Sequence, residues 1–219
     1  MAIITANNLG RLKKKSGPNV FRKWRNLQVM AVYNSEVRNP NTDNQKVVRY
    51  AFATAARIAA AFSSAIMFGF ENVCKGTKTP QRGYFVKTNW NCFHGDASGS
   101  VTVDYEDFVI SQGGLPQIQF GLATFTNPLE VDVPITDNAS AVGADADDIA
   151  YVFVYSPEAG AGILVDSKKR TDPSVAVNVP ANWNGHRVHV YGFGKGSDSN
   201  ALKAGQYSDS LYLGSGTIS

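Results

Sequence analysis

The sequence predicts an α+β protein in which an N-terminal hairpin and a long helix precede a C-terminal antiparallel β-sandwich. Two observations support this fold class. Apolar residues recur at steps of three and four across residues 42–69, as expected for one face of a helix. From residue 101 onward, short alternating runs are separated by turn-rich segments, as expected for strands. We therefore expect two regions, one over residues 1–100 and one over residues 101–219.

The two regions differ in charge. Residues 1–100 contain 15 Lys/Arg and 4 Asp/Glu, whereas residues 101–219 contain 6 and 14. The first region therefore carries a net charge of +11 and the second −8, although the whole chain carries only +3. This separation favours contact of the basic region with a polyanion, or head-to-tail contact between copies of the chain.

The basic region is expected to begin with a hairpin. Residues 18–33, PNVFRKWRNLQVMAVY, read as two short strands around a turn near Arg25–Asn26. Side chains alternate between the two faces of a strand, so Arg22 and Lys23 should lie on opposite faces.

A long helix is expected next. Thr42 and Gln45 form a T-x-x-Q capping box, and Asp43 adds a negative charge at the positive end of the helix dipole. Gly69 is expected to end a helix of roughly 26 residues, which is longer than usual. Its predicted apolar face comprises Val48, Phe52, Ala55, Ala59, Phe62 and Ile66.

A second helix is predicted from Thr79–Pro80 to about Phe93, with Thr79 as its cap and Pro80 in its first turn. The composition of residues 94–99 predicts a loop.

Strands are predicted for the rest of the chain, at residues 107–111, 117–125, 129–135, 149–155, 162–166, 174–179, 186–193 and 207–213. In VPANWNGHRVHVYGF, a tight turn leads into an alternating strand, and Trp183 is placed to plug one end of the sandwich. This corner is similar to the one before the sixth strand of immunoglobulin and fibronectin III-like domains, so we expect an immunoglobulin/fibronectin III-like sandwich.

The segment from Arg11 to Arg25 carries seven cations and no acid. It is the candidate surface for assembly or polyanion contact, through Lys13, Lys14, Lys15, Arg22, Lys23, Trp24 and Arg25. Three interpretations remain open: a basic edge that discourages strand aggregation, docking on the acidic region of a neighbouring copy, and nonspecific DNA contact in which Phe21 and Trp24 stack on bases.

Metal sites are not predicted. His186 and His189 should lie on opposite faces of a strand, and His94 is isolated in a loop. The aspartates at 137, 145, 147 and 148 suit a solvated acidic loop, with calcium as the alternative, although the glycine and final glutamate of an EF-hand are missing.

No catalytic or cofactor-binding residue is predicted. Asp104, Glu106 and Asp107 read as an exposed strand entry. There is no G-x-S-x-G motif, and GFGKGSDSN lacks the spacing of a phosphate-binding loop. Cys74 and Cys92 are expected to be reduced thiols, with a single disulfide as the alternative.

Several segments together resemble an uncharacterised family of about 200 residues from Bacteroidetes bacteria and their phages. They are GPNVF with the following Trp, RNPNTDNQKVVRYAFATA, IMFGF, ISQGGL, ADADDIAYVFVYSP, VPANWNGHRVHVYGF and SDSLYLG. The resemblance implies a helical and hairpin front half, an immunoglobulin-like back half and occurrence in phage genomes, with no known activity. The basic start and the two cysteines depart from the family pattern.

Charge separation, the Ala-rich helix and the resemblance lead us to expect a non-enzymatic virion protein, in a ring or shell of the head, neck or tail. Its expected partners are copies of itself, other virion proteins and, nonspecifically, DNA, with no membrane contact. The start MAIITANNLGRLKKKSG lacks the apolar core of a signal peptide, so we expect synthesis in the host cytoplasm. The alternative is an immunoglobulin-like module that binds a glycan or protein through Trp183, Tyr191, Tyr207 and Tyr212.

Overall fold

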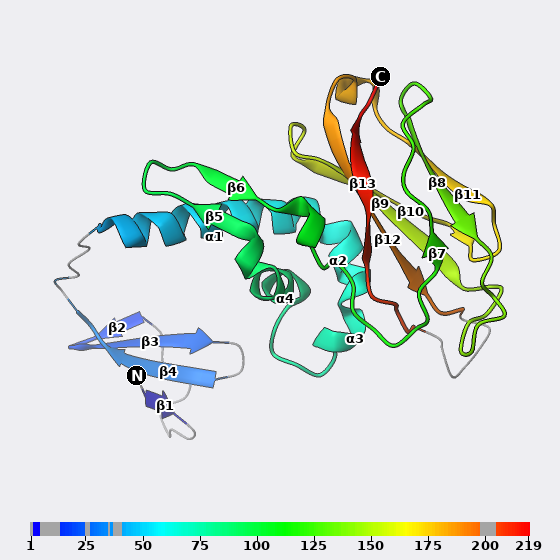
Figure 1. Cartoon of the computed structure of the whole chain (residues 1–219). Coiled ribbons are helices and arrows are strands. Elements are labelled where there is room, and N and C mark those ends of the chain that lie inside the picture. The colour runs from blue at the N-terminus through cyan, green and yellow to red at the C-terminus, as the bar shows by residue number, and fades with distance from the viewer. Residues whose placement is uncertain (1, 5–13, 25–26, 35, 37–40, 198–204) are drawn as a thin grey trace. The chain divides into compact units, whose positions relative to one another are not determined.

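The structure, a computed structural model, describes residues 2–4, 14–24, 27–34, 36, 41–197 and 205–219. The chain forms two compact units, Met1–Thr42 and Asp43–Ser219. The α+β class is confirmed, with helices in the first half and antiparallel sheets in the second (Figure 1). The division predicted near residue 100 falls inside the second unit, because the helices and the sandwich share one core.

The first unit is a four-stranded antiparallel sheet with the order β1-β4-β3-β2. Its strands are β1 (Ala2–Ile4), β2 (Lys14–Ser16), β3 (Asn19–Trp24) and β4 (Leu27–Val32). The predicted hairpin is confirmed, since Trp24 pairs with Leu27 and Asn19 with Val32. Among the described side chains of this unit, Val29 is the one buried apolar residue, at 1% exposure. The described side chains of this sheet therefore contribute one residue to a core.

The second unit begins with two helices where the sequence predicted one. Helix α1 (Asp43–Ala61) starts directly after Thr42, as expected, but the chain bends by 81° before α2 (Ser63–Gly69). The prediction of a single helix to residue 68 is therefore wrong. Phe62 lies at the bend, fully buried, with its ring 4.7–5.7 Å from five other aromatic rings. The bend lets this side chain enter the core that the rings form.

Only part of the predicted apolar face of α1 is buried. Ala51, Ala55, Ile58 and Ala59 face the core, whereas Val48 and Phe52 are 54% and 56% exposed.

No single helix in the described part of the chain is long and apolar enough to cross a membrane. Helices α1 and α2 meet that test only as a bent pair.

The next elements are α3 (Glu71–Cys74), α4 (Gln81–Thr88) and the 3-10 turn η1 (Trp90–Cys92). The second predicted helix is present, but Pro80 rather than Thr79 takes the N-cap position, and the helix ends at Thr88 instead of near Phe93. The predicted loop after it is in fact a hairpin of β5 (Phe93–Gly95) and β6 (Val101–Val103). The Asp96 side chain holds its turn, because one carboxylate oxygen accepts bonds from Ser98, Gly99 and Ser100.

Two antiparallel sheets form the sandwich. One has the order β11-β8-β7 and the other β10-β9-β12-β13. Their strands are β7 (Gln119–Phe120), β8 (Glu130–Thr136), β9 (Ile149–Ser156), β10 (Ala161–Lys169), β11 (Ser174–Asn178), β12 (Arg187–Lys195) and β13 (Leu211–Thr217). Five predicted strands match β8 to β12. The predicted run 117–125 shrinks to β7, and the last strand begins at residue 211 rather than 207.

The predicted strand at 107–111 is wrong. This segment follows the 3-10 turn η2 (Tyr105–Asp107) and does not join a sheet. Its alternation is genuine, since Phe108 and Ile110 are buried against the helices. The buried Asn89 side chain takes the place of a neighbouring strand in bonding the backbone of this segment. Its amide oxygen accepts a hydrogen bond from the Val109 N–H, and its amide nitrogen donates one to the Val109 carbonyl. Alternating burial thus arises here without a strand partner.

The four-stranded sheet is the central layer of the second unit. On β9, Tyr151, Phe153 and Tyr155 face the helices, whereas Ala150, Val152 and Val154 face the three-stranded sheet. Figure 1 shows α2, α3 and α4 on one side of this sheet and β8 and β11 on the other. On β12, Gly192 and Gly194 leave the space into which Phe120 and Ile118 pack. The helices therefore form a third layer on the four-stranded sheet of the sandwich rather than a separate domain.

We predict that Phe62→Ala lowers the free energy of unfolding by about 3–5 kcal/mol, because the change removes a ring from a fully packed cluster. Denaturant-induced unfolding measures this change. The control is Phe52→Ala, which truncates an exposed ring of the preceding helix and should leave stability nearly unchanged. Similar stabilities for the two variants would contradict the assignment of Phe62 as the centre of the shared core.

Candidate functional site

The structure places four of the predicted assembly residues on neighbouring strands of the first unit. Lys14 and Lys15 lie on β2, an edge strand, and Arg22 and Lys23 lie on β3 beside it. All four are exposed. Trp24 is the last residue of β3, and Lys13 and Arg25 lie outside the described residues.

The register divides these cations between the two faces of the sheet. Lys14 pairs with Phe21 and Lys15 with Val20, so adjacent lysines point to opposite faces. Arg22 and Lys23 also alternate, as the sequence predicted. The Lys15 ammonium lies 3.8 Å from the centre of the Tyr33 ring, in a cation–π contact. The four described cations are thus divided between both faces of the sheet, two of them on its edge strand.

A second candidate site is a polar pocket of about 490 Å³ in the second unit. Asp104 lies at the N-cap of η2, which supplies Glu106 and Asp107. The turn after β9 supplies Glu158, and β12 supplies Arg187 and His189. The sequence predicted that Asp104, Glu106 and Asp107 are exposed residues leading into a strand, so the pocket was not foreseen. The strand pairing of β9 and β12 could not be read from the sequence, so neither could the meeting of Glu158 with η2.

Aromatic packing fixes the floor of the pocket. The Tyr105 ring stacks on the His189 ring with centroids 4.3 Å apart. The Tyr191 hydroxyl donates to the Tyr105 carbonyl at 2.7 Å, and His189 Nδ1 lies 3.0 Å from the Tyr212 hydroxyl. These contacts hold η2 against β12, so the pocket is formed in advance of any ligand.

The pocket carries a net negative charge. Burial, with a smaller contribution from nearby Arg187, lowers the pKa of His189 to about 4, so this ring is neutral at pH 7. Arg187 remains as the one positive charge against four carboxylates. Asp104 lies 2.9 Å from His94, and the other three carboxylates make no ion pair with a described residue. The field reaches inward, because Asp107 and Asp104 add to the effect of burial in raising the pKa of the Cys92 thiol.

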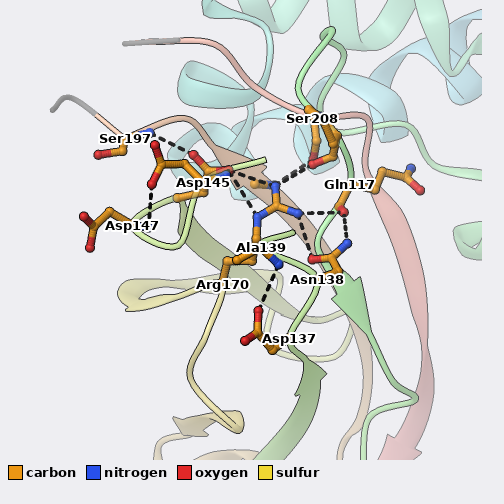
Figure 2. Close-up of polar contacts among 12 residues, drawn as sticks. Gln117, Asp137, Asn138, Ala139, Asp145, Asp147, Arg170, Ser197 and Ser208 are labelled. Carbon is orange, nitrogen blue, oxygen red and sulfur yellow. Dashed lines mark hydrogen bonds and ion pairs between the residues drawn. The ribbon is translucent and has the colours of Figure 1, made fainter. Parts of the chain in front are cut away.

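A buried Arg–Asp pair forms a third polar cluster (Figure 2). The side chains of Arg170 and Asp148 are both 0% exposed. Arg170 Nε and Nη2 lie 3.1 and 3.0 Å from the same Asp148 oxygen. The remaining donors reach Asn138 and the carbonyls of Pro116 and Gln117. All five guanidinium N–H groups are satisfied, and the pair fastens three separate loops to the end of β10.

The acidic loop is exposed at Asp137 and Asp147, as predicted for a solvated loop, but Asp148 is buried. The Asp148 carboxylate accepts N–H bonds from Asp145 and Ser197 in addition to its pairing with Arg170. Asp147 pairs with Lys169 at 2.6 Å. In the described part of the chain, no group of three or more His, Cys, Asp and Glu side chains is arranged to hold a metal ion.

The other candidate residues are also engaged. His186 Nδ1 lies 3.1 Å from the Ser156 hydroxyl, so His186 and His189 have separate partners. Cys74 and Cys92 are buried free thiols whose pKa values are raised by burial. Three residues of the expected aromatic platform, Trp183, Tyr191 and Tyr207, are buried and present no exposed binding surface. Trp183 packs into the sandwich core. This agrees with its predicted role as a plug of the sandwich and not with a role in an exposed platform.

Comparison with known proteins assigns a family but no activity. Residues 11–214 match DUF6266, a family of unknown function, so the chain belongs to that family. No curated protein and no solved structure matches the chain.

We predict that Arg170→Met lowers the free energy of unfolding by about 3–5 kcal/mol, because it leaves the Asp148 carboxylate buried without its counter-charge. Chemical denaturation followed by circular dichroism measures the loss. Lys169→Met is the matched control. It removes the neighbouring pair with Asp147, which is exposed to solvent, and should have little effect. Equal losses would show that burial does not distinguish the two pairs.

His189 should make stability depend on pH. Its pKa is about 4 in the folded protein and 6.5 when exposed, so the unfolded chain binds a proton that the folded chain does not. Stability should be fully retained above pH 6.5 and fall as the pH drops toward 4, by up to about 3 kcal/mol. His189→Gln should remove this component from the pH profile of unfolding. If the free energy of unfolding changed with pH in the same way for wild type and variant between pH 6.5 and 4, this role of His189 would be refuted.

Proposed function

We propose that this member of DUF6266 is a non-enzymatic structural protein of a phage virion, a component of a ring or shell of the head, neck or tail. The small number of buried apolar side chains described in the first unit carries this proposal. A single sheet needs a second layer to cover its apolar face, and units of about 40 residues rarely fold without help such as oligomerisation. Among the described side chains of this sheet, Val29 is the one buried apolar residue.

Charge supports the same proposal. Residues 1–42 contain eight Lys/Arg and one acid, Glu36, whereas residues 43–219 contain 13 Lys/Arg and 17 Asp/Glu. The first unit thus carries +7 and the second −4. Opposite charges on two different surfaces suit a heterologous contact, in which the first unit of one copy meets the second unit of the next. Such contacts close into rings or extend as filaments.

We also infer that the sandwich is of the immunoglobulin/fibronectin III type. Its seven strands divide into a three-stranded and a four-stranded sheet, and the sixth strand lies between the third and the seventh. The 3-10 turn of Trp183 leads into that sixth strand, where the sequence pattern placed the corner. Sandwiches of this type occur as structural and binding modules in proteins of many functions, so the fold does not indicate one activity.

The virion assignment further rests on the resemblance to proteins of Bacteroidetes bacteria and their phages. Under this proposal the protein is made in the host cytoplasm and assembles with copies of itself and with other virion proteins. Nonspecific DNA contact through the exposed cations of β2 and β3 would be secondary.

The full chain should self-associate through charge. Size-exclusion chromatography with light scattering should show oligomers at about 0.05 M salt that weaken toward about 1 M, where charges are screened beyond about 3 Å. Lys15→Glu with Arg22→Glu should weaken the oligomer. Lys75→Glu with Lys78→Glu, an equal charge change at an exposed turn of the second unit, should not.

A strictly monomeric protein at every concentration and salt level would contradict the assembly proposal. Glycan or protein binding by that monomer would favour the alternative of an immunoglobulin-like binding module. Mass spectrometry of purified phage particles is the complementary test of the virion assignment.

A further inference from the structure

We propose that the polar pocket of the second unit is the socket for a basic side chain from the first unit of a second copy. The pocket is the one lined by Asp104, Glu106, Asp107, Glu158, Arg187 and His189. This inference rests on the assembly proposal and deepens it, because it assigns the residues at which two copies meet. The ligand class is a lysine ammonium or an arginine guanidinium carried on a β-strand.

The charges of the pocket select a cation. At pH 7 the four carboxylates face a single arginine, because His189 is neutral. Asp104 is paired with His94, which leaves Glu106, Asp107 and Glu158 without an ion-pair partner among the described residues. Glu158 accepts only long bonds, at 3.4 Å, from the Ser156 hydroxyl and the Arg187 N–H. A guanidinium or ammonium placed between these carboxylates would gain charge-assisted hydrogen bonds.

The shape and walls of the pocket suit a long side chain. A volume of about 490 Å³ lies within the usual range for ligand pockets, about 300–1,000 Å³. Tyr105 and Pro157 provide apolar surface for the methylene stem of a lysine or arginine. Stacking of Tyr105 on His189 and the bond from Tyr191 hold this wall in place. A preformed site loses little conformational entropy on binding.

The first unit supplies cations in the form that the pocket requires. Lys14, Lys15, Arg22 and Lys23 are exposed on adjacent strands, and residues 1–35 contain no Asp or Glu. An edge strand such as β2 can approach another molecule without disturbing its own sheet. Because cations point from both faces of this sheet, one face can enter a pocket while the other remains available to a further neighbour.

Carbodiimide cross-linking of the full chain tests the contact directly, because it joins a carboxylate to a lysine amine only where the two already touch. Equal amounts of ¹⁴N- and ¹⁵N-labelled protein are mixed, cross-linked and digested. We expect mixed-isotope peptides that join Lys14, Lys15 or Lys23 to Glu106, Asp107 or Glu158. Links found only within one isotope would show that the first unit docks on its own chain, and would overturn the proposal.

Charge-matched variants provide the second readout. Glu106→Gln with Glu158→Gln should remove the mixed-isotope links and weaken self-association at least tenfold. The control, Glu130→Gln with Asp166→Asn, removes two carboxylates outside the pocket and should change association less than threefold. Equal weakening by both pairs would mean that general charge, and not the pocket, holds the copies together.

The outcomes separate this inference from the assembly proposal. Oligomers that persist in the pocket variant with unchanged affinity would leave assembly intact and refute the socket. A wild-type chain that never associates would refute both. Saturable binding of free arginine to a monomeric chain would assign the pocket to a small cation and would also overturn the proposal.

Discussion

The structure of the second unit depends on one four-stranded sheet that is buried on both faces. Strands β9 and β12 alternate between two cores: their aromatic side chains face the helices and their valines face the three-stranded sheet. Because the same two strands line both cores, the helices cannot be separated from the sandwich without exposing Tyr151, Phe153 and Tyr155. This constraint also explains the bend at Phe62, which turns the helical segment so that its ring can reach the aromatic face.

The first unit is built on the opposite principle. Among the described side chains of its four strands, Val29 is the one buried apolar residue, and the cations of β2 and β3 are exposed. Under the assembly proposal, another copy covers this sheet. The second unit, by contrast, is well packed and offers an anionic pocket whose walls are fixed by its own core. Under the assembly proposal, the second unit of one copy would complete the first unit of another.

The sequence predicts well where local patterns decide the structure. Hairpin β3–β4, the start of α1 at Asp43 and strands β8 to β12 follow from alternation, capping and turn composition. It fails where tertiary contacts decide. The break at Phe62 requires aromatic partners from four other segments, and residues 107–111 alternate in burial because Asn89 replaces a strand partner. Composition alone identified the basic segment. It could not identify the pocket, because the three elements that line the pocket are brought together only by the order of strands in the sheet. These elements are η2, the turn that follows β9, and strand β12. Arg170 was likewise missed, since a single arginine after two lysines gives no sign of burial.

Under the assembly proposal, the first unit is completed by another copy, whereas the second unit is complete in itself. Hydrogen exchange of the full chain at increasing protein concentration, read separately for the amides of β3–β4 and of β9, measures this difference. Protection of β3–β4 should rise with concentration while that of β9 stays constant. Protection of β3–β4 that is already high in dilute solution and does not change would contradict it.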